Sequence, residues 1–339
     1  MRIAIVNDMP MAAEVLKRAV LLRKTHEIAW VACDGAEALE KCRADTPDLI
    51  LMDLIMPKTD GVQATRAIMA QCPCAILIVT VSVQENARMV FEAMGAGALD
   101  AVDTPALGCG DFEKVSAPLL AKLDSMGCLL RGREAARPAP PPASPRASVS
   151  AAPLVVIGAS AGGPSALAAV LGGLPRDFPS PIVIVQHVDE QFALSLAGWL
   201  KQQCALPVKP AMEGAVPVPG EVLLAVRSDH LILAGPRRLG YCAEPKEAFY
   251  RPSVDIFFES VARRWPGEVV GVLLTGMGRD GAEGLKRLRD AGFHTIAQDR
   301  ATCAVYGMPK AAVHIGAAVE VLPLQAIAAS LCKRCRPSR

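Results

Sequence analysis

The chain has 339 residues, which is enough for two or three domains of ordinary size. Hydrophobic residues make up 52% of it and charged residues 21%, a balance typical of folded rather than intrinsically disordered chains. The formal net charge is only +2, so the composition gives no argument for a polyanionic partner, and we expect no nucleic-acid binding.

A stretch rich in proline and alanine divides the chain. Residues 131–153 consist mostly of Pro, Ala, Ser and Arg and carry no periodic apolar face. Such a composition cannot bury a core and favours extended polyproline segments. We therefore predict one domain at residues 1–125, a linker at residues 126–153 and a second domain at residues 154–335.

Short apolar runs alternate with helical patterns throughout the first domain. This alternation predicts a small doubly wound α/β fold, in which ligands bind at the carboxyl ends of the strands. The predicted strands are residues 3–6, 28–31, 49–52, 75–79 and 98–102, and the predicted helices are residues 11–22, 36–43, 61–70 and 85–94.

Polar residues follow four of these strands. Asp8 follows the first strand and Asp53 the third, so both carboxylates would lie at one edge of a parallel sheet. Two carboxylates at one edge form a hard oxygen site suited to Mg²⁺. The other polar residues at strand ends are Asn7, Thr80, Asp103 and Thr104.

The segment Asp53-Leu-Ile-Met-Pro-Lys-Thr-Asp-Gly61 is more specific than a single acid. With Asp8, Thr80 and the turn Gly95-Ala-Gly-Ala98, it resembles the receiver domain of two-component response regulators, which has a flavodoxin-like fold. The resemblance implies that Asp53 accepts a phosphoryl group. It also implies that Asp8, Asp53 and the main-chain carbonyl of Ile55 bind Mg²⁺, which neutralises charge during the transfer.

Two residues of this receiver pocket depart from the family pattern. Receivers usually carry two acids after the first strand, and the first of them is Asn7 here. The family's lysine after the fifth strand falls on Thr104, so no cation stands there to pair with the phosphoryl group. We still expect phosphorylation, with altered strength and altered coupling to the second domain.

The second domain opens with a strand–turn–helix pattern that fits two interpretations. In the turn Gly158-Ala-Ser-Ala-Gly-Gly163, a serine stands where a dinucleotide-binding loop needs a glycine for close approach of the pyrophosphate. The nearest acid for the ribose, Asp189, comes late for that motif. A receiver-linked dinucleotide-binding oxidoreductase is therefore one alternative, and a nucleophilic Ser160 on a G-x-S-x-G turn is the other.

A nucleophilic serine needs a base, and one histidine is placed to supply it. The apolar run 181–186 leads into His187 and is the next strand after the one that delivers Ser160. Neighbouring parallel strands bring their carboxyl ends to the same edge of a sheet. The other histidines, His26, His230, His294 and His314, show no such placement.

A third polar group would fix the tautomer of the base. The apolar run 269–274 leads into a glycine-rich segment that contains Asp280, again at the carboxyl end of a predicted strand. Capping of the next helix, residues 282–291, is the structural alternative for this acid. The order Ser, His, Asp differs from that of α/β-hydrolases, so their topology is not implied.

Five separated motifs lie along the second domain: Ile157-Gly-Ala-Ser160, Val185-Gln-His187, Tyr250-Arg-Pro-Ser-Val-Asp255, Leu274-Thr-Gly-Met-Gly-Arg-Asp-Gly281 and Tyr306-Gly-Met-Pro309. They resemble the catalytic domain of the CheB-type chemotaxis methylesterases, and the receiver and linker in front complete the family's architecture. The resemblance implies two doubly wound parallel-sheet α/β domains, a flavodoxin-like receiver and a Rossmann-like esterase domain.

The resemblance also implies the chemistry. Ser160 would be the nucleophile, His187 the base and then the acid, and Asp280 the orienting carboxylate. The reaction would hydrolyse glutamate methyl esters of chemoreceptors and deamidate receptor glutamines, without a cofactor. The family usually has threonine where Ala161 follows the nucleophile. The N–H groups of Ala161 and Met277 would stabilise the oxyanion, and Arg251, Ser253 and Asp255 would line the substrate groove.

The implied partners are the cytoplasmic domain of a methylated chemoreceptor and a histidine kinase of a chemosensory system, so we expect a cytoplasmic protein. The eleven cysteines lie mostly in apolar patterns, as expected for reduced thiols. The uncharged stretch 153–175 has membrane length, but internal glycines and Pro164 predict buried core and no membrane insertion. A DNA-binding regulator would need a basic recognition helix, which the second domain does not offer.

Overall fold

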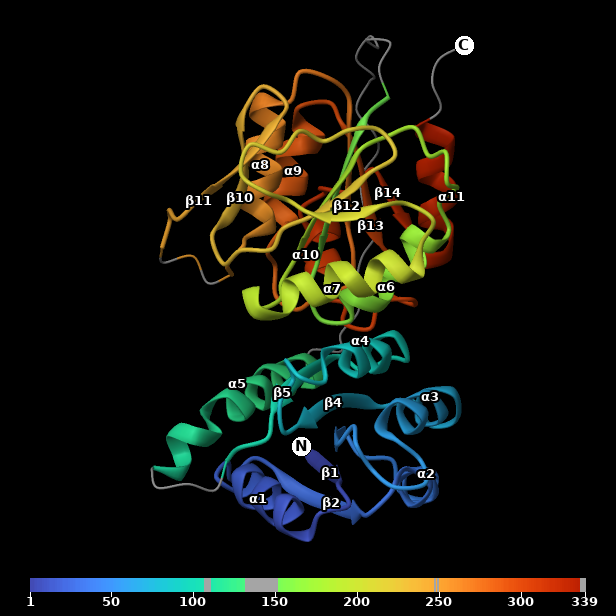
Figure 1. The fold of residues 1–339 in the computed structure, drawn as a ribbon, viewed down its shortest axis with the longest axis vertical. Helices are drawn as coiled ribbons and strands as arrows, with labels where there is room; N and C mark the ends of the chain where they lie inside the picture. The colour runs from blue at the N-terminus through green and yellow to red at the C-terminus, as the bar shows by residue number, and fades with distance from the viewer. Residues whose placement is uncertain (107–110, 132–151, 247, 249, 336–339) are drawn as a thin grey trace. The chain divides into compact units, whose positions relative to one another are not determined.

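The computed structural model describes residues 1–106, 111–131, 152–246, 248 and 250–335. The chain divides into two compact units, Met1–Glu134 and Ala135–Arg339 (Figure 1). Residues 132–151 of the predicted linker lie outside the described residues.

The first unit is a parallel sheet with helices on both faces. Its strands are β1 (Arg2–Val6), β2 (Glu27–Ala32), β3 (Leu49–Met52), β4 (Ala75–Thr80) and β5 (Asp100–Asp103), and its helices are α1 (Pro10–Leu21), α2 (Gly35–Ala44), α3 (Gly61–Gln71), α4 (Ala87–Gly95) and α5 (Phe112–Arg131). The strand order β2-β1-β3-β4-β5 is the flavodoxin-like order. Helices α1 and α5 pack on one face and α2, α3 and α4 on the other (Figure 1).

Most boundaries in this unit differ from the sequence predictions by one or two residues, and two of the differences have a clear physical reason. Strand β5 begins at Asp100 rather than at residue 98, because Gly97 and Ala98 complete the turn that follows α4. Helix α5 continues to Arg131, so residues 126–131 belong to this helix and not to the linker. Met126 is buried in the core that α5 shares with α1, so the helix continues past residue 125, the predicted end of the domain.

The second unit is a larger parallel sheet, again with helices on both faces. Its strands are β6 (Leu154–Ala159), β7 (Ile182–Gln186), β8 (Val208–Pro210), β9 (Val222–Leu224), β12 (Val269–Leu273), β13 (His294–Gln298) and β14 (Glu320–Leu322). Its helices are α6 (Gly163–Gly172), α7 (Glu190–Gln203), α8 (Val254–Arg264), α9 (Ala282–Asp290), α10 (Met308–His314) and α11 (Leu324–Arg334). The strand order is β14-β13-β12-β6-β7-β9-β8, which places β6 between β12 and β7. Every residue of these three strands is buried, as expected where helices cover both faces.

An antiparallel hairpin, which the sequence did not predict, is added to this unit. Strands β10 (His230–Gly235) and β11 (Arg238–Cys242) pair with each other and not with the main sheet. Leu231 and Leu233 are fully buried in the core that includes α8. The predicted fold class, two doubly wound α/β domains with parallel sheets, is confirmed, and the hairpin is an addition to it.

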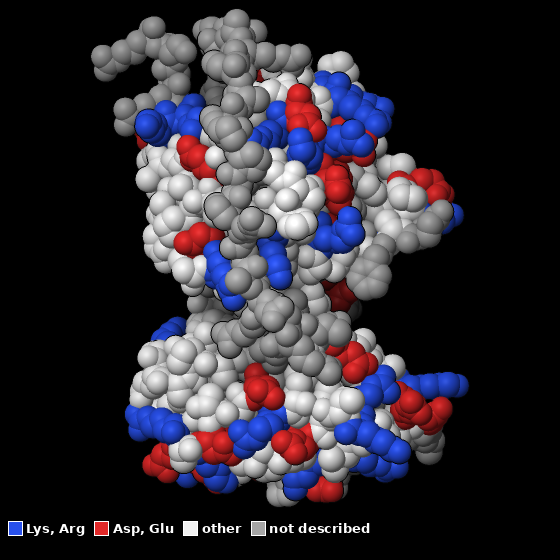
Figure 2. All heavy atoms as spheres, turned by 180° about the vertical axis from the view of Figure 1, so that it is seen from behind, with Lys and Arg blue, Asp and Glu red and all other residues white. Residues whose placement is uncertain are grey.

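The described surface carries mixed charge. Figure 2 shows Lys and Arg interspersed with Asp and Glu on the visible face of each unit, in keeping with the small net charge. Among the described residues, no helix combines the length and the apolar character that crossing a bilayer requires.

Candidate functional site

The three residues predicted to act together lie at one edge of the second sheet. Ser160 follows β6, His187 follows β7 and Asp280 lies beyond β12, and these are neighbouring strands. The His187 N–H donates to the Ala159 carbonyl (3.0 Å) and the Ser160 N–H to the Thr275 carbonyl (3.0 Å), which continues the sheet pairing past the strand ends. The register of the sheet therefore brings the three residues to one edge, as the sequence predicted.

Ser160 occupies a tight turn between β6 and α6. Gly162 begins the helix with a φ of 72°, a left-handed conformation that favours glycine. The hydroxyl of Thr275 donates to the Ala161 carbonyl (3.0 Å) and so fixes the turn from the neighbouring strand. Ser160 is 9% exposed, so its hydroxyl lies at the border between the interior and solvent.

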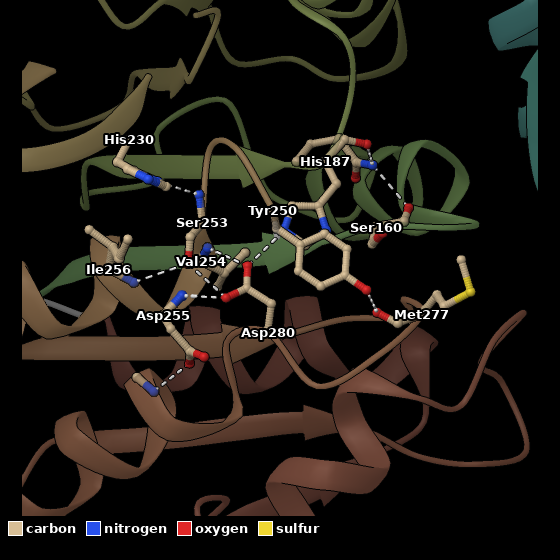
Figure 3. A network of polar contacts seen from close by, with 12 residues as sticks. Ser160, His187, His230, Tyr250, Ser253, Val254, Asp255, Ile256, Met277 and Asp280 are labelled. Carbon is tan, nitrogen blue, oxygen red and sulfur yellow. Dashed lines mark hydrogen bonds and ion pairs between the residues drawn. The ribbon is translucent and has the colours of Figure 1, made fainter. Parts of the chain in front are cut away.

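The imidazole of His187 is held on two sides (Figure 3). Its Nε2 lies 2.8 Å from Asp280 Oδ2. Its ring stacks on the Tyr250 ring, with centroids 4.4 Å apart and planes 6° from parallel. Nδ1 is buried and has no hydrogen-bond partner within the described residues. The ring nitrogen that is turned away from Asp280 is therefore the one available to accept a proton.

Asp280 accepts four hydrogen bonds inside the domain (Figure 3). Besides His187, the donors are the Ser253 hydroxyl (2.7 Å) and the N–H groups of Val254 (2.7 Å) and Asp255 (3.1 Å). Burial opposes ionisation, but hydrogen bonds and charge attraction from His187, helped by Ser253 and Val254, outweigh it and hold the pKa of Asp280 below its usual value. This acid is therefore ionised and firmly oriented.

The structural alternative for Asp280, capping of the helix that follows it, is not what the structure shows. The residue at the N-cap of α9 is Gly281. Asp280 instead accepts hydrogen bonds from the N–H groups of Val254 and Asp255, the first two residues of α8. The N-cap residue of that helix is Ser253. The carboxylate thus benefits from the positive end of α8, where an anion is stabilised.

Two of the three residues predicted to line a substrate groove have a different place in the structure. Ser253 is 5% exposed, and its hydroxyl donates to Asp280. Asp255 accepts the Gly284 N–H (2.7 Å) in the first turn of α9. Arg251, the third, pairs with Asp229 (2.9 Å). The Ser253 hydroxyl and the Asp255 N–H hold Asp280 because the start of α8 packs against the start of α9, near Asp280.

The two amides predicted to stabilise an oxyanion are free to do so. The N–H groups of Ala161 and Met277 donate no hydrogen bond among the described residues. Ala161 directly follows Ser160, and Met277 lies in the loop after β12 that also carries Asp280. The Tyr250 hydroxyl donates to the Met277 carbonyl (3.4 Å) and so contacts this loop.

The receiver pocket lies at the carboxyl ends of β1, β3 and β4. The side-chain amide of Asn7 donates to Asp53 Oδ2 (3.0 Å), so the residue that replaces an acid contacts the predicted acceptor. Burial, with repulsion from Asp8, raises the pKa of Asp53 to about 6, against the effect of the Leu54 and Ile55 amides. A partly buried carboxylate beside a second acid fits a divalent cation, which would relieve both the repulsion and the lost hydration.

The remaining receiver residues occupy the same edge of the sheet. Thr80 is the last residue of β4, and its hydroxyl accepts a hydrogen bond from the Asn86 side chain (3.0 Å). The Thr104 N–H donates to the Thr80 carbonyl (2.8 Å), which places Thr104 beside Thr80. The position of the missing lysine is therefore at the pocket, and threonine provides no charge there.

Comparison with known proteins identifies the family. The profile for CheB methylesterase matches residues 155–331, and the profile for the response regulator receiver domain matches residues 3–106. The chain belongs to the CheB methylesterase family. A protein-glutamate methylesterase/protein-glutamine glutaminase of Burkholderia thailandensis is 59% identical over 98% of this chain and 96% of that protein. One of Pseudomonas aeruginosa is 56% identical over 98% of both.

A solved structure supports the CheB assignment for the second unit. The crystal structure of the Thermotoga maritima CheB methylesterase catalytic domain matches with a TM-score of 0.52 at 38% identity, over 55% of this chain and 99% of that chain. The predicted family is thereby confirmed, and the dinucleotide-binding oxidoreductase is not supported.

Two residues at this CheB site, Tyr250 and His230, had no role in the sequence prediction. Tyr250 was part of a motif but was not expected to stack on His187. His230, set aside as a histidine without a placement, is fully buried; its Nδ1 accepts the Ser253 N–H (3.1 Å), and its Nε2 lies 3.1 Å from the Pro245 carbonyl. Only the packing of the hairpin against α8 reveals that this histidine supports Ser253.

The pKa of Asp255 leads to a stability prediction. Burial, with repulsion from Asp280, raises the pKa of Asp255 to about 7, against the effect of the Gly284 amide. Because the folded state then binds more protons than the unfolded state between pH about 4 and about 7, ionisation of Asp255 destabilises the fold as the pH rises through that window. Asp255→Asn removes this cost, so its melting temperature relative to the wild type should increase from pH about 5 to about 8.

The measurement is thermal unfolding of both proteins across this pH range. Other titrating groups are common to both, so the difference reports on Asp255 and its repulsion with Asp280. Asp177→Asn, which changes an exposed acid, is the matched control and should show no such trend. A constant difference between Asp255→Asn and wild type at all pH values would contradict the prediction.

Proposed function

We propose that this chain is a protein-glutamate methylesterase with protein-glutamine glutaminase activity, regulated by phosphorylation of its receiver domain. Its substrate would be the methylated cytoplasmic domain of a chemoreceptor. The observation that carries the proposal is the His187–Asp280 pair (2.8 Å) at the sheet edge that also presents Ser160. The names of the whole-length relatives, which are protein-glutamate methylesterases/protein-glutamine glutaminases, support the substrate.

The reaction would proceed through an acyl-enzyme. Ser160 Oγ attacks the ester carbonyl while His187 Nδ1 takes its proton, and the Nε2–H bond to Asp280 stabilises the resulting imidazolium. The N–H groups of Ala161 and Met277 donate hydrogen bonds to the carbonyl oxygen and stabilise the negative charge that develops on it. His187 then returns the proton to the leaving methoxide, and methanol departs.

Water completes the cycle. His187 takes a proton from the water as it attacks the acyl-enzyme, and the bond to Ser160 Oγ breaks as the serine regains a proton. The products are a free glutamate side chain and the original enzyme. With a glutamine side chain as substrate, the first leaving group is ammonia rather than methanol, and the rest of the cycle is unchanged.

The receiver would be phosphorylated on Asp53 by a histidine kinase of a chemosensory system. Asp8, Asp53 and the Ile55 carbonyl would hold Mg²⁺, which neutralises charge on the phosphoryl group during transfer. Because the pKa of Asp53 is raised to about 6, we expect Mg²⁺ affinity to fall as the pH drops below that value. Thr104 cannot pair with the phosphoryl group as a lysine would, so the activation step depends on the remaining polar groups, among them Thr80.

Methanol release tests this function and its regulation together. Wild-type protein is incubated with methylated receptor, with and without Mg²⁺ and a small phosphodonor, and we expect the phosphodonor to increase the rate. Asp53→Asn should prevent labelling by the phosphodonor and remove the increase, while its basal release persists. Undiminished labelling of Asp53→Asn would place the acceptor elsewhere, and no release from the wild type would refute the esterase function.

A further inference from the structure

Gln186, the last residue of β7, connects the nucleophile to the base through its side chain. It is 2% exposed, and its Nε2 donates to the Ser160 carbonyl (2.9 Å) and to the His187 carbonyl (3.0 Å). The two carbonyls belong to the residues that follow β6 and β7. One buried amide thus ties together the two strand ends on which the proposed reaction depends.

The orientation of this amide is fixed by its partners. Both partners are carbonyl oxygens, so only the NH₂ group can face them. Its Oε1 has no hydrogen-bond partner within the described residues and packs against Gly163, where an added Cβ would lie only 2.0 Å from it. Gly163 is the first residue of α6, and the positive end of a helix favours a carbonyl oxygen there.

The bond to the Ser160 carbonyl also sets the direction of the next amide. The peptide group between Ser160 and Ala161 is planar and trans, so its C=O and N–H point in opposite directions. A donor that holds the Ser160 carbonyl inside the domain therefore aims the Ala161 N–H the other way. That N–H donates no hydrogen bond among the described residues and is one of the two N–H groups proposed to bind the oxyanion.

We propose that Gln186 is a positioning residue for this reaction: its amide locks the peptide that carries the Ala161 oxyanion donor and holds that peptide in register with His187. The proposal rests on the proposed esterase function. Gly163 N–H also donates to the Ser160 carbonyl (2.7 Å), so this carbonyl keeps one hydrogen bond when Gln186 is changed. The turn should then fold but lose its fixed orientation relative to His187.

The first test is Gln186→Met, which keeps the length of the side chain and removes both donors. Steady-state methanol release from methylated receptor is measured with full-length protein, Mg²⁺ and phosphodonor. We expect kcat to fall roughly tenfold to a hundredfold with KM little changed, because the orientation matters most when the oxyanion forms. Unchanged kcat, or a raised KM with unchanged kcat, would overturn the proposal.

Thr295→Val is the matched control for the loss of buried hydrogen bonds. Thr295 lies in β13, is fully buried, donates to the Ala317 carbonyl (2.7 Å) and accepts the Val319 N–H (3.1 Å), away from Ser160. Both variants should unfold at a lower temperature than the wild type, but only Gln186→Met should lose kcat. An equal loss of kcat in Thr295→Val would show that lowered stability is responsible, and would overturn the positioning role.

Gln186→Glu provides a second, independent measurement. An ionised glutamate places an oxygen against two carbonyl oxygens, whereas a protonated one can donate one of the two lost bonds. The ratio of its kcat to that of the wild type should therefore rise as the pH is lowered from about 8 to about 6. A ratio independent of pH would count against the proposal. Failure of the wild type itself to release methanol would instead refute the proposed function.

Discussion

Ser160→Ala is expected to abolish methanol release from methylated receptor while the protein stays folded. In the proposed mechanism, loss of the attacking oxygen leaves no acyl-enzyme route, and removal of a single nucleophile from such a group of residues lowers kcat by roughly 10⁶-fold. The fold should survive because the interactions of Ser160 that hold the turn are made by its backbone: its N–H donates to Thr275, and its carbonyl accepts from Gly163 and Gln186.

The experiment combines methanol release with thermal unfolding. Ser165→Ala, which changes a serine in the helix that follows the turn, is the matched control and should keep wild-type release. If Ser160→Ala released methanol at more than a small fraction of the wild-type rate, the nucleophile would have to be another group. If it lost activity and also unfolded, the result would report on stability, so an unchanged melting temperature is part of the expectation.

The convergence of Ser160, His187 and Asp280 could be predicted because it depends on a general property of parallel sheets. Each residue follows an apolar run, and neighbouring parallel strands end at one edge. The same argument placed Asp8 and Asp53 together in the receiver. The sequence alone did not determine the order of the strands in the sheet. The structure shows that β6 lies between β12 and β7.

The support around these residues could not be predicted, because it depends on how α8 packs against its neighbours. Ser253 and Asp255 carry polar side chains in a motif near the site, which suits a substrate groove equally well in sequence. Only the contact between the starts of α8 and α9 turns them towards Asp280 and Gly284. The role of His230 likewise requires the hairpin, whose strands pair only with each other.

The environment of Asp280 makes its replacement by asparagine the second large effect. The carboxylate accepts bonds on both oxygens: Oδ1 from Ser253 and the Asp255 N–H, and Oδ2 from His187 and the Val254 N–H. An asparagine has one acceptor oxygen and one NH₂ group. Whichever way it turns, its NH₂ meets a backbone N–H of α8, so we expect a stability loss of about 1–3 kcal/mol.

The effect of Asp280→Asn on the reaction should be larger than its effect on stability. If the NH₂ group faces His187, the ring must present Nε2 as an acceptor and carry its proton on Nδ1, the nitrogen that has to accept the proton of Ser160. If the oxygen faces His187, the negative charge that stabilises the imidazolium is still gone. Either way kcat should fall by roughly 10⁴-fold. Asp255→Asn is the control: the Asp255 carboxylate contacts Gly284 and not His187, so this variant should retain most of the activity. If Asp280→Asn kept more than a tenth of the wild-type kcat, His187 would not depend on the Asp280 carboxylate.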